Sequence, residues 1–385
     1  MPGFDFPTSQ LRPPLCDYRT MKEPGEWLDI GERVRECRMA ADMSQEELAS
    51  ELKLDRTMIA KIERGVRRVD ALELARLSAV LQVPLSYFLD PPPLVVSRRT
   101  ELADDTVTDA SRQSHRLAVA LSTWLADIRQ LVGTGVFTPP AIERCPEPVQ
   151  DASSARRAAL WVRECSGHGL EPIDSLMSVC EKLGQLVAVV EVPGEGASLV
   201  EDDVAVAVVG KHGDPGRRRA TAAHELGHLI VGDEYSTDIG VHASRDDREA
   251  IIDAFAAELL LPAEAFHRGV RTGEGARREH LVILAARYRT SWSLTVRQAV
   301  EAGAIARGVA KDMRRRNPTR AELMEAVGWA PQPDLETVRV PPSFAHAVLE
   351  SFKRSLITGS RAVELMRGQI VAADLPVRDD ADCEL

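Results

Sequence analysis

Residues 222–231 form an apolar run, Ala-Ala-His-Glu-Leu-Gly-His-Leu-Ile-Val, whose polar side chains follow the order His-Glu-x-x-His. In a helix, His224 and His228 lie one turn apart on the same face, where two imidazoles can bind one zinc ion. Glu225 is rotated by about 100° from His224. It can therefore miss the metal and still act as a base on a water bound to it. The alternative is a buried helix that carries two histidines by accident, so the motif needs a third ligand.

A second helical pattern, over residues 248–262, supplies a candidate for that ligand. Isoleucine, phenylalanine and leucine recur at helical spacing, and Pro262 ends the predicted helix. Glu249 and Asp253 lie four residues apart and share a face. Glu249 can reach the metal, and Asp253 can accept the free ring N–H of a metal-binding histidine. The alternative for this pair is the solvated face of a core helix.

A His-Glu-x-x-His helix followed by a Glu-x-x-x-Asp helix is the ligand pattern of gluzincin metallopeptidases. A metzincin site needs a glycine three residues and a histidine six residues after His228, where Val231 and Glu234 stand. The segments Arg-Arg-Ala-Thr-Ala-Ala-His-Glu-Leu-Gly-His and Glu-Ala-Ile-Ile-Asp-Ala-Phe-Ala-Ala-Glu-Leu-Leu-Leu-Pro resemble those of the ImmA/IrrE family of zinc metallopeptidases, and the resemblance covers residues 152–270.

The two motifs together predict a zinc site with His224, His228 and Glu249 as ligands. Asp253 is expected to accept a hydrogen bond from the ring of one of these histidines. Glu225 is the expected general base in peptide hydrolysis. The resemblance further implies that the substrate is a transcriptional repressor, often of the XRE type, whose cleavage derepresses genes.

Residues 28–90 have the pattern of a compact all-helical domain. Ser44 stands three residues before Glu47 and predicts a capping box at the start of the second helix. Asp55 and Gly65 predict the start and the end of the third helix. The segments Ser-Gln-Glu-Glu-Leu-Ala and Lys-Ile-Glu-Arg-Gly resemble those of XRE/Cro-type helix-turn-helix domains, and the match extends over the whole domain.

The third helix of this domain is the expected recognition helix. An arginine at its start can read guanine in a major groove, and a threonine methyl group can contact thymine. A glutamine at the start of the preceding helix can hydrogen-bond a phosphate. The alternative is a solvated basic helix in a protein-interaction module. Since one such domain reads a half-site, a homodimer is expected. The predicted DNA contacts are Gln45, Arg56, Thr57, Ala60, Lys61 and Arg64.

Length and composition place limits on the class of protein. The 385 residues are enough for two or three domains. The formal net charge of -11 argues against nucleic-acid binding by the whole surface, although a local basic element can still bind. The six scattered cysteines indicate neither a disulfide framework nor a thiolate zinc site. The chain starts without a signal pattern and contains no apolar run of membrane-spanning length, so we expect a cytoplasmic protein.

The predicted fold class is multidomain: an all-α helix-turn-helix domain, then an α+β zinc-peptidase domain, then a helical C-terminal region. Strands are expected at 186–192 and 204–209, followed by a turn-rich link over 210–219. The second strand is either an edge strand that binds an extended substrate or an internal core strand. The predicted order is a flexible arm (1–27), the helix-turn-helix domain (28–90), a linker with a connecting helix (91–151), the peptidase domain (152–270), the helical C-terminal region (271–375) and a tail (376–385). The C-terminal region is expected to include a small module for partner contact or dimerisation.

These patterns favour a DNA-binding regulator with zinc-dependent endopeptidase activity. The alternative is a regulator or antitoxin-like protein whose metal domain senses a ligand or partner without proteolysis. Glu225 argues against this alternative, because a purely structural zinc site does not need a base. Four residues near the motifs are candidates for stabilising the oxyanion, and the sequence does not choose among them. The alternative for each is a surface or packing residue. The candidates are His212, Tyr235, His242 and His267.

Overall fold

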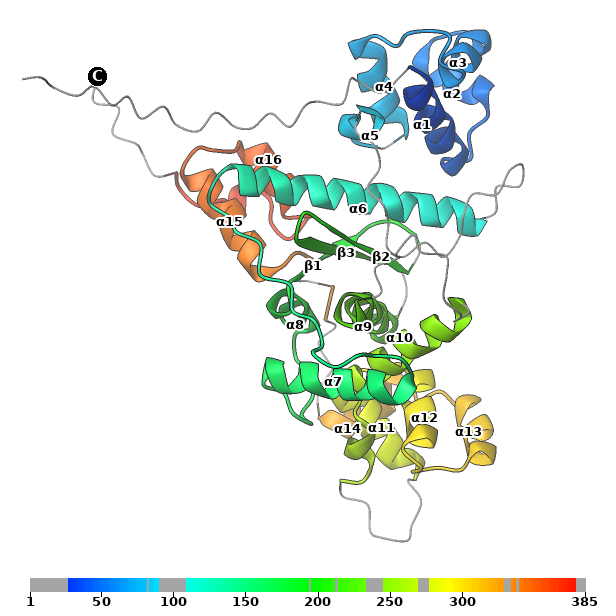
Figure 1. Ribbon diagram of the computed structural model, residues 1–385, viewed down its shortest axis with the longest axis vertical. Helices are drawn as coiled ribbons and strands as arrows, with labels where there is room; N and C mark the ends of the chain where they lie inside the picture. The colour runs from blue at the N-terminus through cyan, green and yellow to red at the C-terminus, as the bar shows by residue number, and fades with distance from the viewer. Residues whose placement is uncertain are drawn as a thin grey trace, which may run out of the picture. The chain divides into compact units, whose positions relative to one another are not determined.

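The chain divides into two compact units, residues 1–91 and 92–385, which are described here separately (Figure 1). None of the described helices is both long and apolar enough to cross a lipid bilayer. The computed structural model describes residues 27–81, 83–89, 109–193, 195–211, 214–232, 245–268, 277–328, 334–336 and 339–378.

The described part of the first unit is entirely helical, as predicted. Ser44 and Glu47 form the expected capping box: the Ser44 hydroxyl accepts from the Glu47 N–H at 3.1 Å, and the Glu47 carboxylate accepts from the Ser44 N–H at 2.7 Å. Asp55 occupies the N-cap position of the third helix but makes no side-chain capping bond. The helices are α1 (Trp27–Ala40), α2 (Gln45–Leu52), α3 (Arg56–Glu63), α4 (Ala71–Leu81) and α5 (Leu85–Leu89).

A buried carboxylate connects the first three helices of this unit. Glu63, at the end of α3, is 6% exposed. Its Oε1 lies 2.6 Å from Nε of Arg38 on α1, and its Oε2 accepts from Nε2 of Gln45 on α2 at 2.7 Å. A buried charge is tolerated only with partners of this kind. Glu63 therefore fixes α3 relative to the start of α2.

The second unit is built on a three-stranded sheet of β1 (Gln185–Val190), β2 (Gly196–Glu201) and β3 (Val204–Gly210). The order is β1-β3-β2, with β1 parallel and β2 antiparallel to β3. The strand predicted at 204–209 is therefore central, and the edge-strand interpretation was wrong for it. The edges of the described sheet are β1 and β2. Strand β2 was not predicted, because Gly-Ala-Ser-Leu-Val-Glu contains few residues that favour strands.

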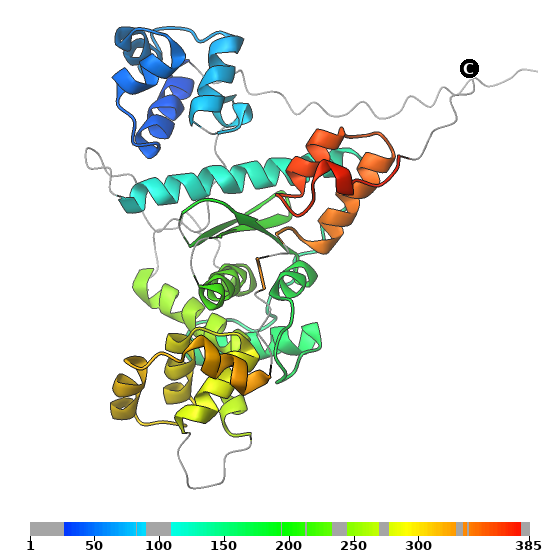
Figure 2. The ribbon, with the colours of Figure 1, turned by 180° about the vertical axis from the view of Figure 1, so that it is seen from behind.

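One face of the sheet is covered by α6 (Asp109–Gly133), α15 (Pro342–Lys353) and α16 (Gly359–Leu365) (Figures 1 and 2). Trp124 of α6 is fully buried and donates its indole N–H to the carbonyl of Leu186 at 2.8 Å. The predicted connecting helix is thus a structural layer of this unit. The C-terminal helices α15 and α16 share its core, so they are not the separate module that was expected.

The opposite face packs against α9 (Pro215–Val231), which contains the His-Glu-x-x-His motif. This helix begins earlier than expected, inside the predicted link over 210–219. The Asp214 carboxylate caps it through the N–H of Gly216 at 2.8 Å, and Pro215 occupies the first turn, where a missing N–H costs nothing. The remaining elements on this side are α7 (Ala152–Ser166), α8 (Leu176–Lys182), α10 (Arg245–Leu260), η1 (Ala263–Phe266), α11 (Arg278–Tyr288), α12 (Trp292–Glu301), α13 (Arg307–Arg314) and α14 (Arg320–Val327), and the short η2 (Ala372–Asp374) follows α16.

Candidate metal centre

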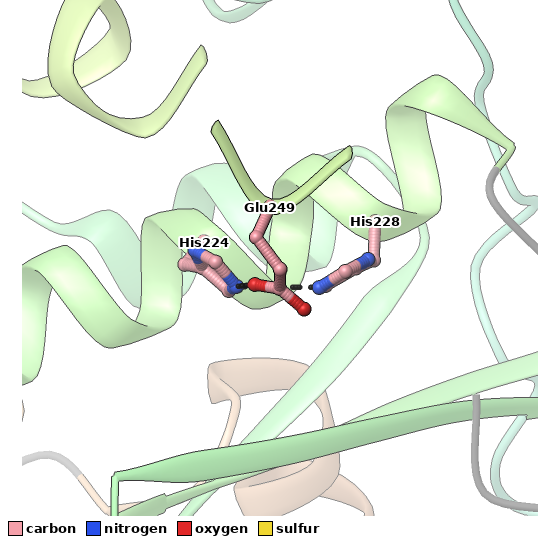
Figure 3. Close-up of side chains that lie close together, drawn as sticks. All are labelled: His224, His228 and Glu249. Atoms are coloured by element: carbon pink, nitrogen blue, oxygen red, sulfur yellow. Dashed lines mark hydrogen bonds and ion pairs between the residues drawn. The ribbon is translucent and has the colours of Figure 1, made fainter. Parts of the chain in front are cut away.

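Helices α9 and α10 bring the three predicted ligands together. One ligand atom each from His224, His228 and Glu249 lie within 4.8 Å of one another. Nε2 of His224 is 3.2 Å from Nε2 of His228 and also 3.2 Å from Oε2 of Glu249. Figure 3 shows the Glu249 carboxylate between the two imidazole rings.

This donor set fits a zinc ion. Zn–N bonds of about 2.0–2.1 Å in a tetrahedral arrangement separate neighbouring ligand atoms by about 3.3 Å, close to the two 3.2 Å distances from His224 Nε2. Two imidazoles and one carboxylate are the ligands of catalytic zinc sites that keep a fourth position for water or substrate. Both histidines are buried, and the Glu249 side chain is 25% exposed although its Oε2, which faces His224, is itself buried.

A glycine inside α9 allows α10 to approach closely enough. A Cβ atom at Gly227 would lie 2.9 Å from Cγ2 of Ile252 and 3.0 Å from Cδ1 of Phe255. Both neighbours are buried on α10 and have little room to move. Gly227 therefore determines the distance between the two helices, and with it the reach of Glu249 to the histidines. The sequence signal was a glycine in a helix interior, where it is otherwise unfavourable.

Asp253 is within hydrogen-bond distance of the His224 ring, as the spacing predicted. Its Oδ1 is 3.1 Å from Nδ1 of His224, and its Oδ2 is 3.8 Å from Nη1 of Arg297 on α12. Burial alone would lower the pKa of His224, but hydrogen bonds to Asp253 and Glu249 outweigh it and raise the pKa to about 9 in the metal-free protein. The carboxylates around His224 therefore favour positive charge at this imidazole.

Glu225 points from α9 toward the sheet and is 3% exposed. Its Oε2 accepts a hydrogen bond from Oγ of Ser198 on β2 at 2.6 Å, and its backbone carbonyl accepts from Nε2 of Gln185 on β1 at 2.9 Å. Neither partner was found from the sequence. Ser198 was missed because its strand was not predicted, and a strand position alone gives no sign of which helix residue it faces.

An open cleft of about 1160 Å³ borders the site. His224, Glu225 and Asp253 are part of its lining, and so are the first residues of β2. The volume exceeds that of pockets for small ligands, which are typically about 300–1,000 Å³. Three arginines from different helices also line it: Arg217, Arg297 and Arg314.

One of the four oxyanion candidates lies within the described residues. His212, Tyr235 and His242 lie outside the described residues. His267 is exposed at the end of η1 and does not belong to the described lining of the cleft.

In the first unit, the predicted DNA-contacting side chains occupy one short region. Arg56, Thr57, Lys61 and Arg64 are exposed, and Ala60 is half-buried. Gln45 departs from the expectation of a simple phosphate contact, because its amide donates to Glu63.

Comparison with known families covers both units. A family model described as helix-turn-helix matches residues 34–88. A peptidase-family model described as the IrrE N-terminal-like domain matches residues 185–297. The chain is a helix-turn-helix protein fused to an IrrE-like domain. The IrrE-like match starts later and ends later than the predicted 152–270. It contains the whole sheet, all three candidate ligands, Glu225 and Ser198.

Curated proteins similar to a short part of this helix-turn-helix fusion protein are named as uncharacterized transcriptional regulators or as a control protein. An uncharacterized HTH-type transcriptional regulator of Sinorhizobium medicae is 38% identical over 66 residues, which are 17% of this chain and 48% of the relative. The control protein C.BamHI of Bacillus amyloliquefaciens is 43% identical over 62 residues, 16% of this chain and 76% of the relative. A transcriptional regulator in the ATPase CF(0) region of Rhodospirillum rubrum is 39% identical over 75 residues, 20% of this chain and 68% of the relative. The chain thus spans about half the length of the Sinorhizobium relative.

Proposed function

We propose that the protein is a DNA-binding regulator whose IrrE-like domain is a zinc-dependent endopeptidase that cleaves a transcriptional repressor. One observation carries the enzymatic part: His224, His228 and Glu249 converge within 4.8 Å, with Glu225 on the same helix and a large cleft beside them. A purely structural zinc site has no need of an adjacent carboxylate or of an open cleft.

The residues of the chain have separate roles in this mechanism. His224, His228 and Glu249 hold the metal, and Asp253 accepts the Nδ1–H of His224 so that Nε2 faces the site. Bound zinc supplies Lewis acidity, which polarises a peptide carbonyl and acidifies water. Glu225 accepts a proton from the attacking water and transfers it to the leaving amine.

The cleft favours an extended polypeptide as the substrate. Gly196 and Ala197 of β2 line it next to Glu225, and β2 is an edge of the described sheet. An edge strand can pair with an extended peptide through backbone hydrogen bonds. The edge role that was one of two alternatives for the strand at 204–209 therefore belongs to β2 in this proposal.

The helix-turn-helix domain is proposed to bind an operator as a homodimer. Support comes from the exposed Arg56, Thr57 and Lys61 on α3 and from relatives that are named as transcriptional regulators. Gln45 keeps a part in this proposal, since its amide nitrogen carries two hydrogens. One hydrogen serves Glu63, and the second can contact a phosphate at the start of α2.

Mass spectrometry of candidate XRE-type repressors incubated with the zinc-loaded full-length protein tests the proposal. We expect peptide products with the wild type, and at least about 100-fold slower cleavage with Glu225→Gln, because the base is lost. Glu264→Gln changes an exposed carboxylate on η1 and should cleave like the wild type. Equal cleavage by Glu225→Gln would contradict the mechanism. Operator binding that responds to zinc or a partner, with no peptide product, would support the sensor or antitoxin-like alternative.

A further inference from the structure

Strand β2 holds the carboxylate of Glu225 through two residues that are two positions apart. Residues i and i+2 of a strand face the same side of a sheet. Ser198 donates its hydroxyl to Oε2 of Glu225 at 2.6 Å. A Cβ atom at Gly196 would lie 3.1 Å from Oε1 and 2.6 Å from Cγ2 of Thr221. Ser198 therefore binds one carboxylate oxygen, and Gly196 leaves space for the other.

The two carboxylate oxygens have different surroundings as a result. Gly196 and Glu225 both line the cleft, whereas Ser198 is 4% exposed and does not belong to the described lining of that cleft. Ser198 lines a second, small cavity together with His228. A hydrogen bond to a buried carboxylate is charge-assisted and short, so it restricts the side-chain torsions of Glu225. Oε2 accepts the hydrogen bond from Ser198, whereas Oε1 lies on the side of Gly196.

We propose that Ser198 is a positioning residue for the general base: its hydroxyl fixes the Glu225 carboxylate so that Oε1 faces the cleft for proton transfer. The inference rests on the proposed peptidase function. Ser198 does not touch the substrate in this proposal and acts only through Glu225. Misplacement of a catalytic group by about 1 Å can cost about 100-fold in rate.

Steady-state kinetics of Ser198→Ala on a repressor that the wild type cleaves test the proposal. We expect kcat to fall about 10- to 100-fold, with KM and bound zinc per chain within about twofold of the wild type. Ser351→Ala is the matched control, because Ser351 is a fully buried serine in the other core of the same unit and its hydroxyl is 3.5 Å from that of Thr134. Its kcat should equal that of the wild type.

A double variant separates positioning from a general structural role. If Ser198 acts through Glu225, Ser198→Ala should not slow the residual cleavage by Glu225→Gln any further. If the effects of the two substitutions on kcat multiply in the double variant, the proposal is overturned. It is also overturned if the loss of kcat in Ser198→Ala parallels a loss of bound zinc or of folded protein.

The hydrogen bond itself can be measured without a substrate. In an unfolding cycle of Ser198→Ala, Glu225→Ala and the double variant, the two melting-temperature shifts should not add, since the residues are direct partners. Additive shifts overturn the proposal. A wild type that cleaves while Ser198→Ala retains full kcat contradicts only the role of Ser198. A wild type that cleaves no repressor contradicts the proposed function, and with it the reaction in which Ser198 would act.

Discussion

Nδ1 of His224 lies 3.1 Å from Oδ1 of Asp253, so a carboxylate on α10 orients an imidazole on α9. Asp253 accepts from the Nδ1–H, and Nε2 faces His228 and Glu249. This contact prearranges the ligands before a metal arrives. It also connects the site to α12, since the second oxygen of Asp253 is 3.8 Å from Arg297.

Replacing Asp253 by alanine should weaken zinc binding about 10- to 100-fold, because the His224 ring loses the partner that orients it. Competition with a chromophoric chelator measures the affinity. Glu264→Ala, an exposed carboxylate on η1, is the control for a lost negative charge and should bind zinc like the wild type. If Asp253→Ala bound zinc with unchanged affinity, the orienting role would be wrong.

Zinc affinity should rise with pH over the range in which His224 loses its proton. The pKa of this imidazole is about 9 instead of 6.5, so the metal-free site is protonated at neutral pH. Zinc must displace that proton, and affinity should increase about tenfold per pH unit from pH 7 to 9. Calorimetry in buffers of different ionisation enthalpy counts the released protons. Asp253→Asn removes one cause of the raised pKa, so it should release fewer protons near pH 7.

The same pKa predicts how the stability of the metal-free protein depends on pH. The folded-state pKa lies above the ordinary value of 6.5, so folding binds a proton between these values. The contribution of His224 is therefore complete below about pH 6.5 and is lost as the pH rises through 9. Urea unfolding of chelator-treated protein across this range should show falling stability, and a His224→Gln variant should lack this component.

Much of the metal site follows from helical periodicity. Side chains three or four residues apart share a helix face, so His224 and His228 had to lie together, and so did Glu249 and Asp253. That the two faces meet was inferred from the need of the motif for a third ligand and from the resemblance to gluzincin metallopeptidases. The start of α9 shows the limit of this reasoning: Asp214 and Pro215 are helix-starting residues, but the glycines before and after them resembled a turn.

Contacts that depend on tertiary packing could not be predicted in this way. Ser198 meets Glu225 only because β2 pairs with β3 in one particular register, with Ser198 opposite Ala207. Shifting that pairing by one residue would turn Ser198 to the other face of the sheet. Trp124 is a similar case: its position on an amphipathic helix indicated burial, but not that a sheet lies beneath it.

Gly227→Ala should push α10 away from α9. The new Cβ would come within 3.0 Å of Ile252 and Phe255, and overpacking of this kind costs about 1–3 kcal/mol. Zinc affinity should fall as well, since Glu249 moves with α10. Chemical unfolding and zinc titration measure the two effects. Gly308→Ala on α13 is the control, because its Cβ would meet no atom within 4 Å and alanine favours helix. If Gly227→Ala and Gly308→Ala had the same free energy of unfolding, the packing argument would be contradicted.

In the helix-turn-helix domain, Glu63→Ala should destabilise the unit by about 3 kcal/mol, because Arg38 would lose its buried partner. Hydrogen exchange measured by mass spectrometry should show lost protection in peptides from α1, α2 and α3. Peptides from the IrrE-like domain report on the other unit and should be unchanged. Glu46→Ala, an exposed carboxylate on α2, is the matched control. Retained protection in Glu63→Ala would mean that the network of Glu63 does not hold the three helices together.

Arg56→Ala should weaken binding to the specific operator about 10- to 100-fold and leave binding to unrelated DNA less affected, because an arginine on a recognition helix reads base edges.

Lys61→Ala distinguishes phosphate contact from base reading among the exposed charges on α3. If Lys61 contacts a phosphate, its loss should weaken binding to all sequences alike. It should also reduce the slope of log affinity against log salt concentration by about one. Arg35, exposed on α1, provides a charge-matched control. Fluorescence anisotropy at several salt concentrations measures all three variants. If Arg35→Ala weakened operator binding as much as Arg56→Ala, recognition by α3 would be the wrong assignment, since general charge would then explain the binding.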